Sequence, residues 1–174
     1  MRRDFSFLES LIHEFFTNEK ISRYFKTFAE YEIKGWENWL QIELAHFFSR
    51  HDSGLEWKRE VTLKFDGRKE RNKIYFRPDF ILRKKHWTLG RYVALEIKQD
   101  PSPTACLNKL LSDIDKVSKI RPSELNIRSL WGLGITKLPE YKEPLPFLLE
   151  HIDEKSNVML AKRIGNTEYV YFIF

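Results

Sequence analysis

Three ionisable side chains interrupt two apolar segments in the middle of the chain. Asp79 lies within KIYFRPDFIL, directly after Pro78, and Glu96 and Lys98 lie within RYVALEIKQD. A charge among apolar residues costs desolvation energy, and proline removes a hydrogen bond from a strand ladder. Two carboxylates can bind Mg2+, and a lysine beside them can position a water or stabilise charge on a phosphate. Together, these residue types indicate metal-assisted hydrolysis of a phosphate ester.

The segments that carry these residues alternate in the way that strands do. Alternation over residues 91–98 predicts that Glu96 and Lys98 project from one face, opposite a face of Val93, Leu95 and Ile97. A hairpin between residues 73–83 and 91–98 would bring Asp79 to the edge where Glu96 lies. Residues 57–65 alternate in the same way and predict a preceding strand.

The elements around these strands follow from periodicity and from capping residues. Apolar spacing predicts three helices before the strands, and Ser102 with Pro103 predicts the start of another helix that runs to Ile120. A buried strand, a short helix and a closing hairpin are expected after it. The expected segments are residues 5–16, 21–28, 36–50, 102–120, 127–135, 144–152, 157–164 and 168–174. This order indicates a mixed α/β or α+β architecture in one domain.

Charge and composition restrict the partners and the compartment. The chain has 174 residues and a net charge of +5, and thirteen Lys or Arg but only five Asp or Glu fall within residues 58–98. Such a basic block favours a polyanionic partner, although a solvated surface explains it equally well. The only cysteine is Cys106, which favours a reducing, cytoplasmic setting. No apolar run approaches the roughly 20 residues that cross a bilayer, so no membrane partner is expected.

Other common sites are not indicated by the sequence. The five histidines show no HExxH spacing, which argues against zinc. The GLG at residues 132–134 lies within a buried strand pattern and lacks the lysine of a phosphate loop. Trp87, in the turn KKHWTLG, either stacks on a nucleotide base or packs its own loop.

The pair Pro78-Asp79, followed after sixteen residues by Glu96-Ile97-Lys98, resembles the motif of the PD-(D/E)XK nuclease superfamily. The resemblance covers residues 35–135 and leaves a helical extension (residues 1–34) and a C-terminal helix and hairpin (136–174) outside it. It implies a restriction endonuclease-like core, in which helices flank a central mixed β-sheet.

The resemblance also implies a set of site residues. Asp79, Glu96 and the backbone carbonyl of Ile97 would hold Mg2+, with Mn2+ able to substitute, and Lys98 would lie next to the attacking water. An upstream helix often supplies another glutamate. Glu37 is favoured for this role, with Glu43 as the alternative, and Gln99 is a weaker candidate for contacting metal-bound water or a phosphate.

The implied function is a Mg2+-dependent nuclease that hydrolyses phosphodiester bonds, with DNA favoured over RNA as its substrate. Two alternatives remain open. One is a catalytically silent protein of the same fold with a binding or immunity-type role. The other is a nuclease subunit that is active only with a partner protein, as in transposase-like or phage-defence systems. A homodimer is also compatible with the family.

Overall fold

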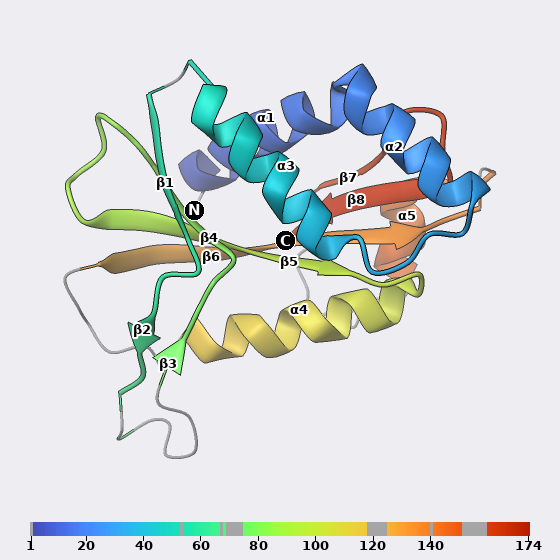
Figure 1. The fold of residues 1–174 in the computed structure, drawn as a ribbon. Coiled ribbons are helices and arrows are strands. Elements are labelled where there is room, and N and C mark those ends of the chain that lie inside the picture. Colours follow the sequence, from blue (N-terminus) through green and yellow to red (C-terminus); the bar gives the residue numbers. More distant parts are fainter. Residues whose placement is uncertain are drawn as a thin grey trace.

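A computed structural model shows a mixed six-stranded sheet with helices on both faces (Figure 1). The order is β1-β4-β5-β6-β8-β7, and only β5 and β6 pair in parallel. The strands are β1 (Leu55–Arg59), β4 (Phe80–Lys84), β5 (Arg91–Gln99), β6 (Asn126–Lys137), β7 (Leu160–Arg163) and β8 (Tyr169–Ile173). The structure describes residues 2–52, 54–66, 68, 75–117, 125–139, 141–150 and 160–174.

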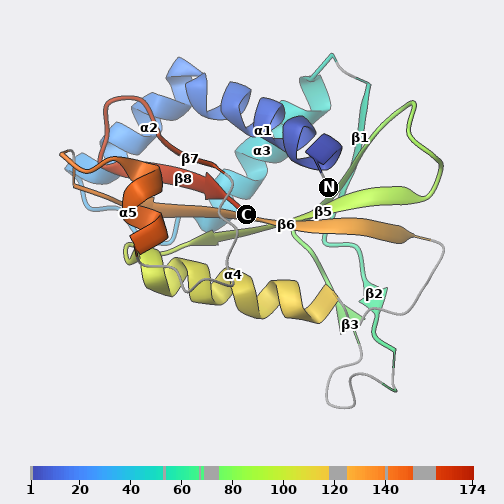
Figure 2. The same cartoon turned by 180° about the vertical axis from the view of Figure 1, so that it is seen from behind.

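Three helices cover one face of the sheet, and two cover the other (Figures 1 and 2). The first group is α1 (Arg2–Thr17), α2 (Glu19–Glu30) and α3 (Glu37–Arg50), and the second is α4 (Pro103–Val117) and α5 (Pro144–Glu150). Helix α4 joins the parallel strands β5 and β6, because a parallel pair needs such a crossover. Within the described residues, no helix is both long and apolar enough to span a bilayer.

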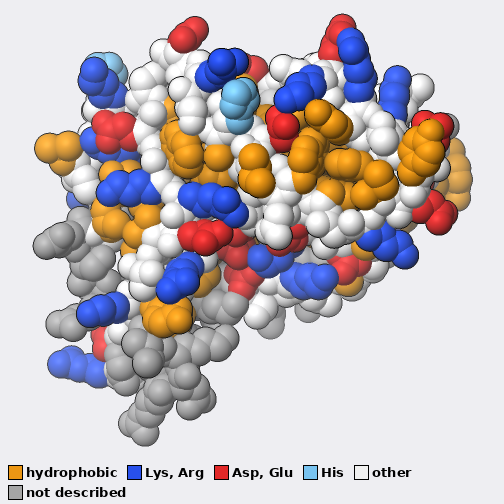
Figure 3. All heavy atoms as spheres, in the orientation of Figure 1, with side chains coloured by type: hydrophobic (Ala, Val, Ile, Leu, Met, Phe, Trp, Pro, Cys, Tyr) orange, Lys and Arg blue, Asp and Glu red, His pale blue; other side chains and the backbone are white. Residues whose placement is uncertain are grey.

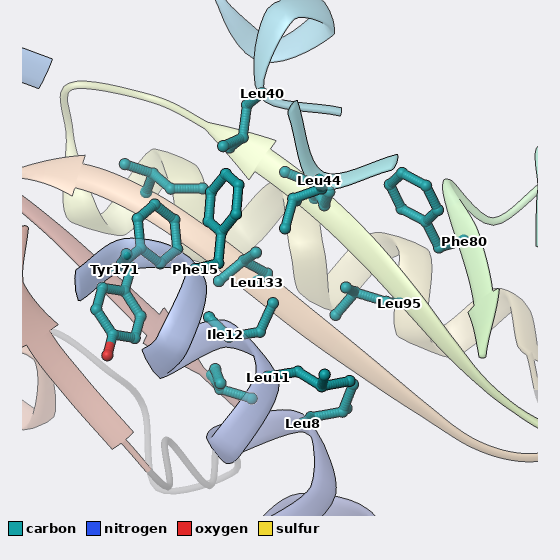
Figure 4. Close-up of a cluster of buried hydrophobic side chains, with 14 of the residues drawn as sticks. Leu8, Leu11, Ile12, Phe15, Leu40, Leu44, Phe80, Leu95, Leu133 and Tyr171 are labelled. Carbon is teal, nitrogen blue, oxygen red and sulfur yellow. The ribbon is translucent and has the colours of Figure 1, made fainter. Parts of the chain in front are cut away.

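The main hydrophobic core lies between the sheet and the first three helices. Leucine, isoleucine and phenylalanine side chains of α1 and α3 meet the inner faces of β4, β5, β6 and β8 (Figure 4). This cluster combines the N-terminal helices, the central strands and the final strand in one buried layer. A smaller cluster on the opposite face packs α4 and α5 against Phe172 and Phe174. Burial of apolar area on both faces fixes the sheet between the two helical layers.

Most expected elements are present, and two strand predictions are wrong in the same place. The strand expected over residues 57–65 ends at Arg59, and Glu60 has a positive φ of 51° that turns the chain. The strand expected over 73–83 is interrupted by Arg77, Pro78 and Asp79. The parts of these two segments that lie outside the six-stranded sheet form a separate two-stranded sheet, in which β2 (Leu63–Lys64) pairs with β3 (Tyr75–Phe76).

The remaining expectations agree with the described chain. The Ser102 hydroxyl accepts the Ala105 N–H at 3.4 Å, as a helix cap does, and α4 begins at Pro103. The closing hairpin of β7 and β8 turns through Gly165, which has a φ of +55°. The predicted end of the helix at Ile120 and the start of the hairpin at 157–159 lie outside the described residues.

Candidate active site

Asp79 lies at the point where β4 separates from β5. The ladder between the two strands begins at Phe80, which pairs with Leu95, so the last four residues of β5 extend beyond it. Asp79 Oδ2 accepts the Ile97 N–H at 2.7 Å, and the Asp79 N–H donates to Glu96 Oε2 at 3.3 Å. The aspartate side chain therefore takes the place of a strand partner, which explains why proline and aspartate are tolerated beside a central strand.

The predicted alternation along β5 is confirmed. Val93, Leu95 and Ile97 belong to the main core under α1 and α3. Glu96 and Lys98 face α4, where the lysine ammonium lies 2.7 Å from Glu96 Oε1 and 3.3 Å from Asp113 Oδ2 of that helix. Lys98 is directed into the site by carboxylates on two elements.

Helix α3 contributes two polar side chains one turn apart. Glu37 Oε2 accepts the Gln99 N–H at 2.9 Å at the end of β5. Gln41 is buried and donates through Nε2 to Asp79 Oδ1 at 2.8 Å, while its Oε1 accepts from Arg59 Nη2 at 2.8 Å. Residues four apart lie on the same face of a helix, so both side chains reach the β4–β5 edge.

Glu43, the alternative to Glu37, points to a different part of the molecule. Its carboxylate pairs with Lys20 of α2 at 3.1 Å. It follows Gln41 by two residues, a rotation of about 200° around the helix, which directs it away from β5. Of the two glutamates, the structure places Glu37 beside the strand that carries Glu96 and Lys98.

The two backbone and amide candidates have different placements. In an extended strand, the N–H and C=O of one residue face the same side, so the Ile97 carbonyl lies on the side of β5 where Asp79 accepts the Ile97 N–H. Gln99 also lines a pocket with Lys34 and Lys137. Gln99 is joined to the candidate active site through its backbone N–H, which donates to Glu37.

Two glycines of β6 leave room for the rings of Phe172 and Phe174 to pack against the strand next to β5. Gly132 and Gly134 are the register partners of Glu96 and Lys98 on β5. A Cβ atom on Gly134 would lie 2.1 Å from the ring of Phe172, and one on Gly132 would lie 2.8 Å from that of Phe174. The GLG sequence therefore serves packing of the aromatic C-terminus, in agreement with the absence of a phosphate-loop pattern.

Burial and an excess of carboxylates together set the electrostatics of the site. Burial, partly offset by the Ile97 hydrogen bond and Lys98, raises the pKa of Asp79 from 3.8 to about 6, and Glu37 and Asp113 add to this rise. Burial and the neighbouring Asp79 raise the pKa of Glu96 from 4.5 to about 7. The pKa of Lys98 lies above its usual range because these carboxylates outweigh the effect of burial.

The Lys98 ammonium thus faces Glu96 of β5 and Asp113 of α4, and it also interacts electrostatically with Asp79. The space-filling view shows Asp and Glu side chains gathered between the positions of α3 and α4, with Lys and Arg side chains beside them (Figure 3). Like charges at short range in a partly buried site disfavour full ionisation. A bound cation would remove this repulsion.

Three residues of the site were not found from the sequence: Gln41, Arg59 and Asp113. Gln41 had a detectable signal, since it is a polar residue one turn after Glu37 on an apolar helix. Asp113 had a weaker one, as an acidic residue among the apolar positions of α4. Arg59 gave none, because the alternating pattern placed it inside a longer strand.

The donor set has the chemistry that Mg2+ prefers, because oxygen ligands from Asp79, Glu96, Glu37 and the Ile97 carbonyl belong to adjoining segments. Within the described residues, however, no three acidic, histidine or cysteine side chains are already arranged as a metal-binding group. Gln41 and Lys98 now occupy oxygens of Asp79 and Glu96. A metal ion could bind these two oxygens only after the hydrogen bonds from Gln41 and Lys98 break.

In comparisons with known proteins, the chain matched no protein-family model, no curated protein and no solved structure.

Proposed function

We propose that the protein is a Mg2+-dependent nuclease of the PD-(D/E)XK type, with a restriction endonuclease-like core, and that it hydrolyses phosphodiester bonds in DNA. The observation that carries the proposal is the gathering of Asp79, Glu96 and Asp113 around Lys98, with Glu37 close enough to act on Asp79. Raised carboxyl pKa values in such a cluster are typical of sites that bind cations or transfer protons.

Each side chain has a role in this proposal. Asp79 and Glu96 would hold the ion, with Glu37 and the Ile97 carbonyl completing its protein ligands. When bound, Mg2+ supplies a lowered pKa for a coordinated water and neutralises charge on the phosphate. Lys98, released from Glu96, would position the attacking water and stabilise charge on the phosphate oxygens.

Gln41, Arg59 and Asp113 hold the side chains of Asp79 and Lys98 in position. Gln41 uses both ends of its amide, so Arg59 fixes its orientation and it in turn fixes Asp79. Asp113 keeps the Lys98 ammonium directed towards Glu96. Such supporting hydrogen bonds restrict rotamers and keep the reacting groups within the narrow range of productive geometry.

The surface next to Asp79 is suited to a polyanion. The exposed cationic residues Lys58, Lys64 and Arg77 lie on or beside β1, β2 and β3, and the Arg77 guanidinium stacks 4.8 Å from the ring of Tyr75. Lys and Arg contacts with phosphates provide most of the sequence-independent affinity for nucleic acids. This location supports the assignment of the basic block to substrate binding.

The test is cleavage of plasmid and linear duplex DNA in the presence of Mg2+ or Mn2+, with EDTA as the negative control. Wild type should cleave, Asp79→Asn should lose about 100-fold or more of the rate, and Glu43→Gln should retain it. The proposal would be falsified if wild type neither cleaves nor binds metal more tightly than Asp79→Asn in calorimetry.

A silent protein of the same fold is the second candidate, and one observation favours it. Protein donors already engage Asp79 and Glu96, as they would in a purely structural network. Metal binding without cleavage of DNA or RNA, alone or with partner proteins purified from the native host, would support this reading. Cleavage that starts only after such a partner is added would identify a partner-dependent subunit.

A further inference from the structure

A pocket lies near the end of β4 that is opposite the candidate active site. Its volume is about 570 Å³, and its polar lining comes from Arg2, Arg3, Ser6, Ser10 and Lys84, with His51 at its side. Figures 1 and 2 both show the start of α1 near the turn between β4 and β5, away from the start of α3. Four residue steps along β4 separate Lys84 from Phe80, a distance of about 13 Å.

The charges of this pocket are unbalanced. Three of its lining residues are permanent cations, and none is a carboxylate. Of the nearby acids, Asp4 binds Arg128, and Glu14 lies 3.2 Å from His51 at the side of the pocket. Over the ranges described here, no carboxylate pairs with Arg2, Arg3 or Lys84. Among the described residues, the pocket therefore presents Arg2, Arg3 and Lys84 without a carboxylate partner.

Hydroxyl and aromatic groups give the pocket two chemically different parts. Ser6 and Ser10 lie one turn apart on α1, on the side of the helix that lines the pocket. The other wall is formed by Phe7 and Trp87, whose rings meet edge to face with centroids 5.0 Å apart, and the Arg128 guanidinium lies over the Trp87 ring at 4.6 Å from its centroid. The Lys84 ammonium lies 5.1 Å from the centre of the Phe7 ring, between the two parts.

We propose that this pocket binds a nucleoside monophosphate unit, with the phosphate at the Arg3, Ser6 and Lys84 side and the base against Trp87. Arginine forks and a lysine ammonium are the common phosphate ligands of proteins, and an aromatic wall accepts the flat face of a base. The volume falls within the range of small-ligand sites. Either a free nucleotide or the 5′-terminal nucleotide of a strand has this chemistry.

Calorimetry in EDTA tests this site without any catalytic step. AMP should bind more tightly than inorganic phosphate or adenosine alone, and Lys84→Glu and Arg3→Glu should each weaken AMP binding by about tenfold or more. Lys26→Glu, the same charge reversal at an exposed position of α2, is the matched control and should change it less than about twofold. Asp79→Asn should bind AMP as wild type does, which separates this site from the nuclease proposal.

A trinucleotide with or without a 5′-phosphate distinguishes the two sources of the ligand. Tighter binding of the phosphorylated form, lost in Lys84→Glu, assigns the pocket to a strand end, and binding of AMP alone assigns it to a free nucleotide. Absence of saturable AMP binding, equal losses in Lys84→Glu and Lys26→Glu, or unchanged binding in both pocket variants would overturn the inference. Unfolding curves of Lys84→Glu that match wild type show that any loss is local.

Discussion

Replacing Asp79 with asparagine should stabilise the folded protein at pH 8 when no divalent cation is present. In wild type the pKa of this carboxyl rises from 3.8 to about 6 on folding, chiefly through burial. Each pKa unit corresponds to about 1.4 kcal/mol, so the ionised side chain destabilises the fold by about 3 kcal/mol at pH 8. The amide would lose the bond from Gln41, at a cost of about 1 kcal/mol. The net gain expected at pH 8 is therefore about 2 kcal/mol.

The sign of the pH dependence follows from proton binding. The folded protein binds the Asp79 proton more tightly than the unfolded chain does, so wild type loses stability as the pH rises from about 4 to about 6. Asparagine does not titrate, and the variant should lack this part of the decline. At pH 5 the penalty in wild type is about half of its value at pH 8, so the gain from the substitution should shrink to about 0.5 kcal/mol.

Urea unfolding followed by tryptophan fluorescence at pH 5, 6 and 8, in EDTA, measures these differences. Glu43→Gln is the matched control, because Glu43 forms a partly exposed ion pair with Lys20, and its effect should stay below about 1 kcal/mol. Added Mg2+ should stabilise wild type but not Asp79→Asn. Equal destabilisation by Asp79→Asn at all three pH values would refute the reasoning, because it would show that this carboxylate holds the fold together.

Three further substitutions test the site and the layer beneath it. Lys98→Met should lower the metal-dependent cleavage rate by about 100-fold while leaving metal affinity measurable by calorimetry. Glu37→Gln should weaken metal binding by about tenfold, and Glu43→Gln should not, as equilibrium titration with Mn2+ can show. Gly134→Ala should lower the free energy of unfolding by about 1–3 kcal/mol, because its Cβ would overlap the Phe172 ring, and urea unfolding gives the value. An unchanged value would mean that the ring moves freely.

The sequence predicted the elements of the fold where local patterns agree with tertiary packing. Alternation over residues 91–98 identified both faces of β5, and the hairpin with the preceding strand follows from two adjacent strand patterns. The same reasoning failed over residues 57–65. There the apolar pattern continues through Glu60, although the left-handed conformation of that residue ends β1 and starts a separate ribbon.

Residue types and strand alternation were enough to predict Asp79, Glu96 and Lys98 as candidate site residues and to place Glu96 and Lys98 on one face of a strand. Which side chains of the flanking helices lie beside these residues depends on how the helices pack against the sheet. Helical periodicity shows that Glu37 and Gln41 share a face, but not that this face meets β5. The contact of Asp113 with Lys98 likewise depends on how α4 returns along the sheet. Such contacts arise from packing between elements that are distant in sequence. A local pattern of residues predicts the face of one helix or strand, but not which other element packs against that face.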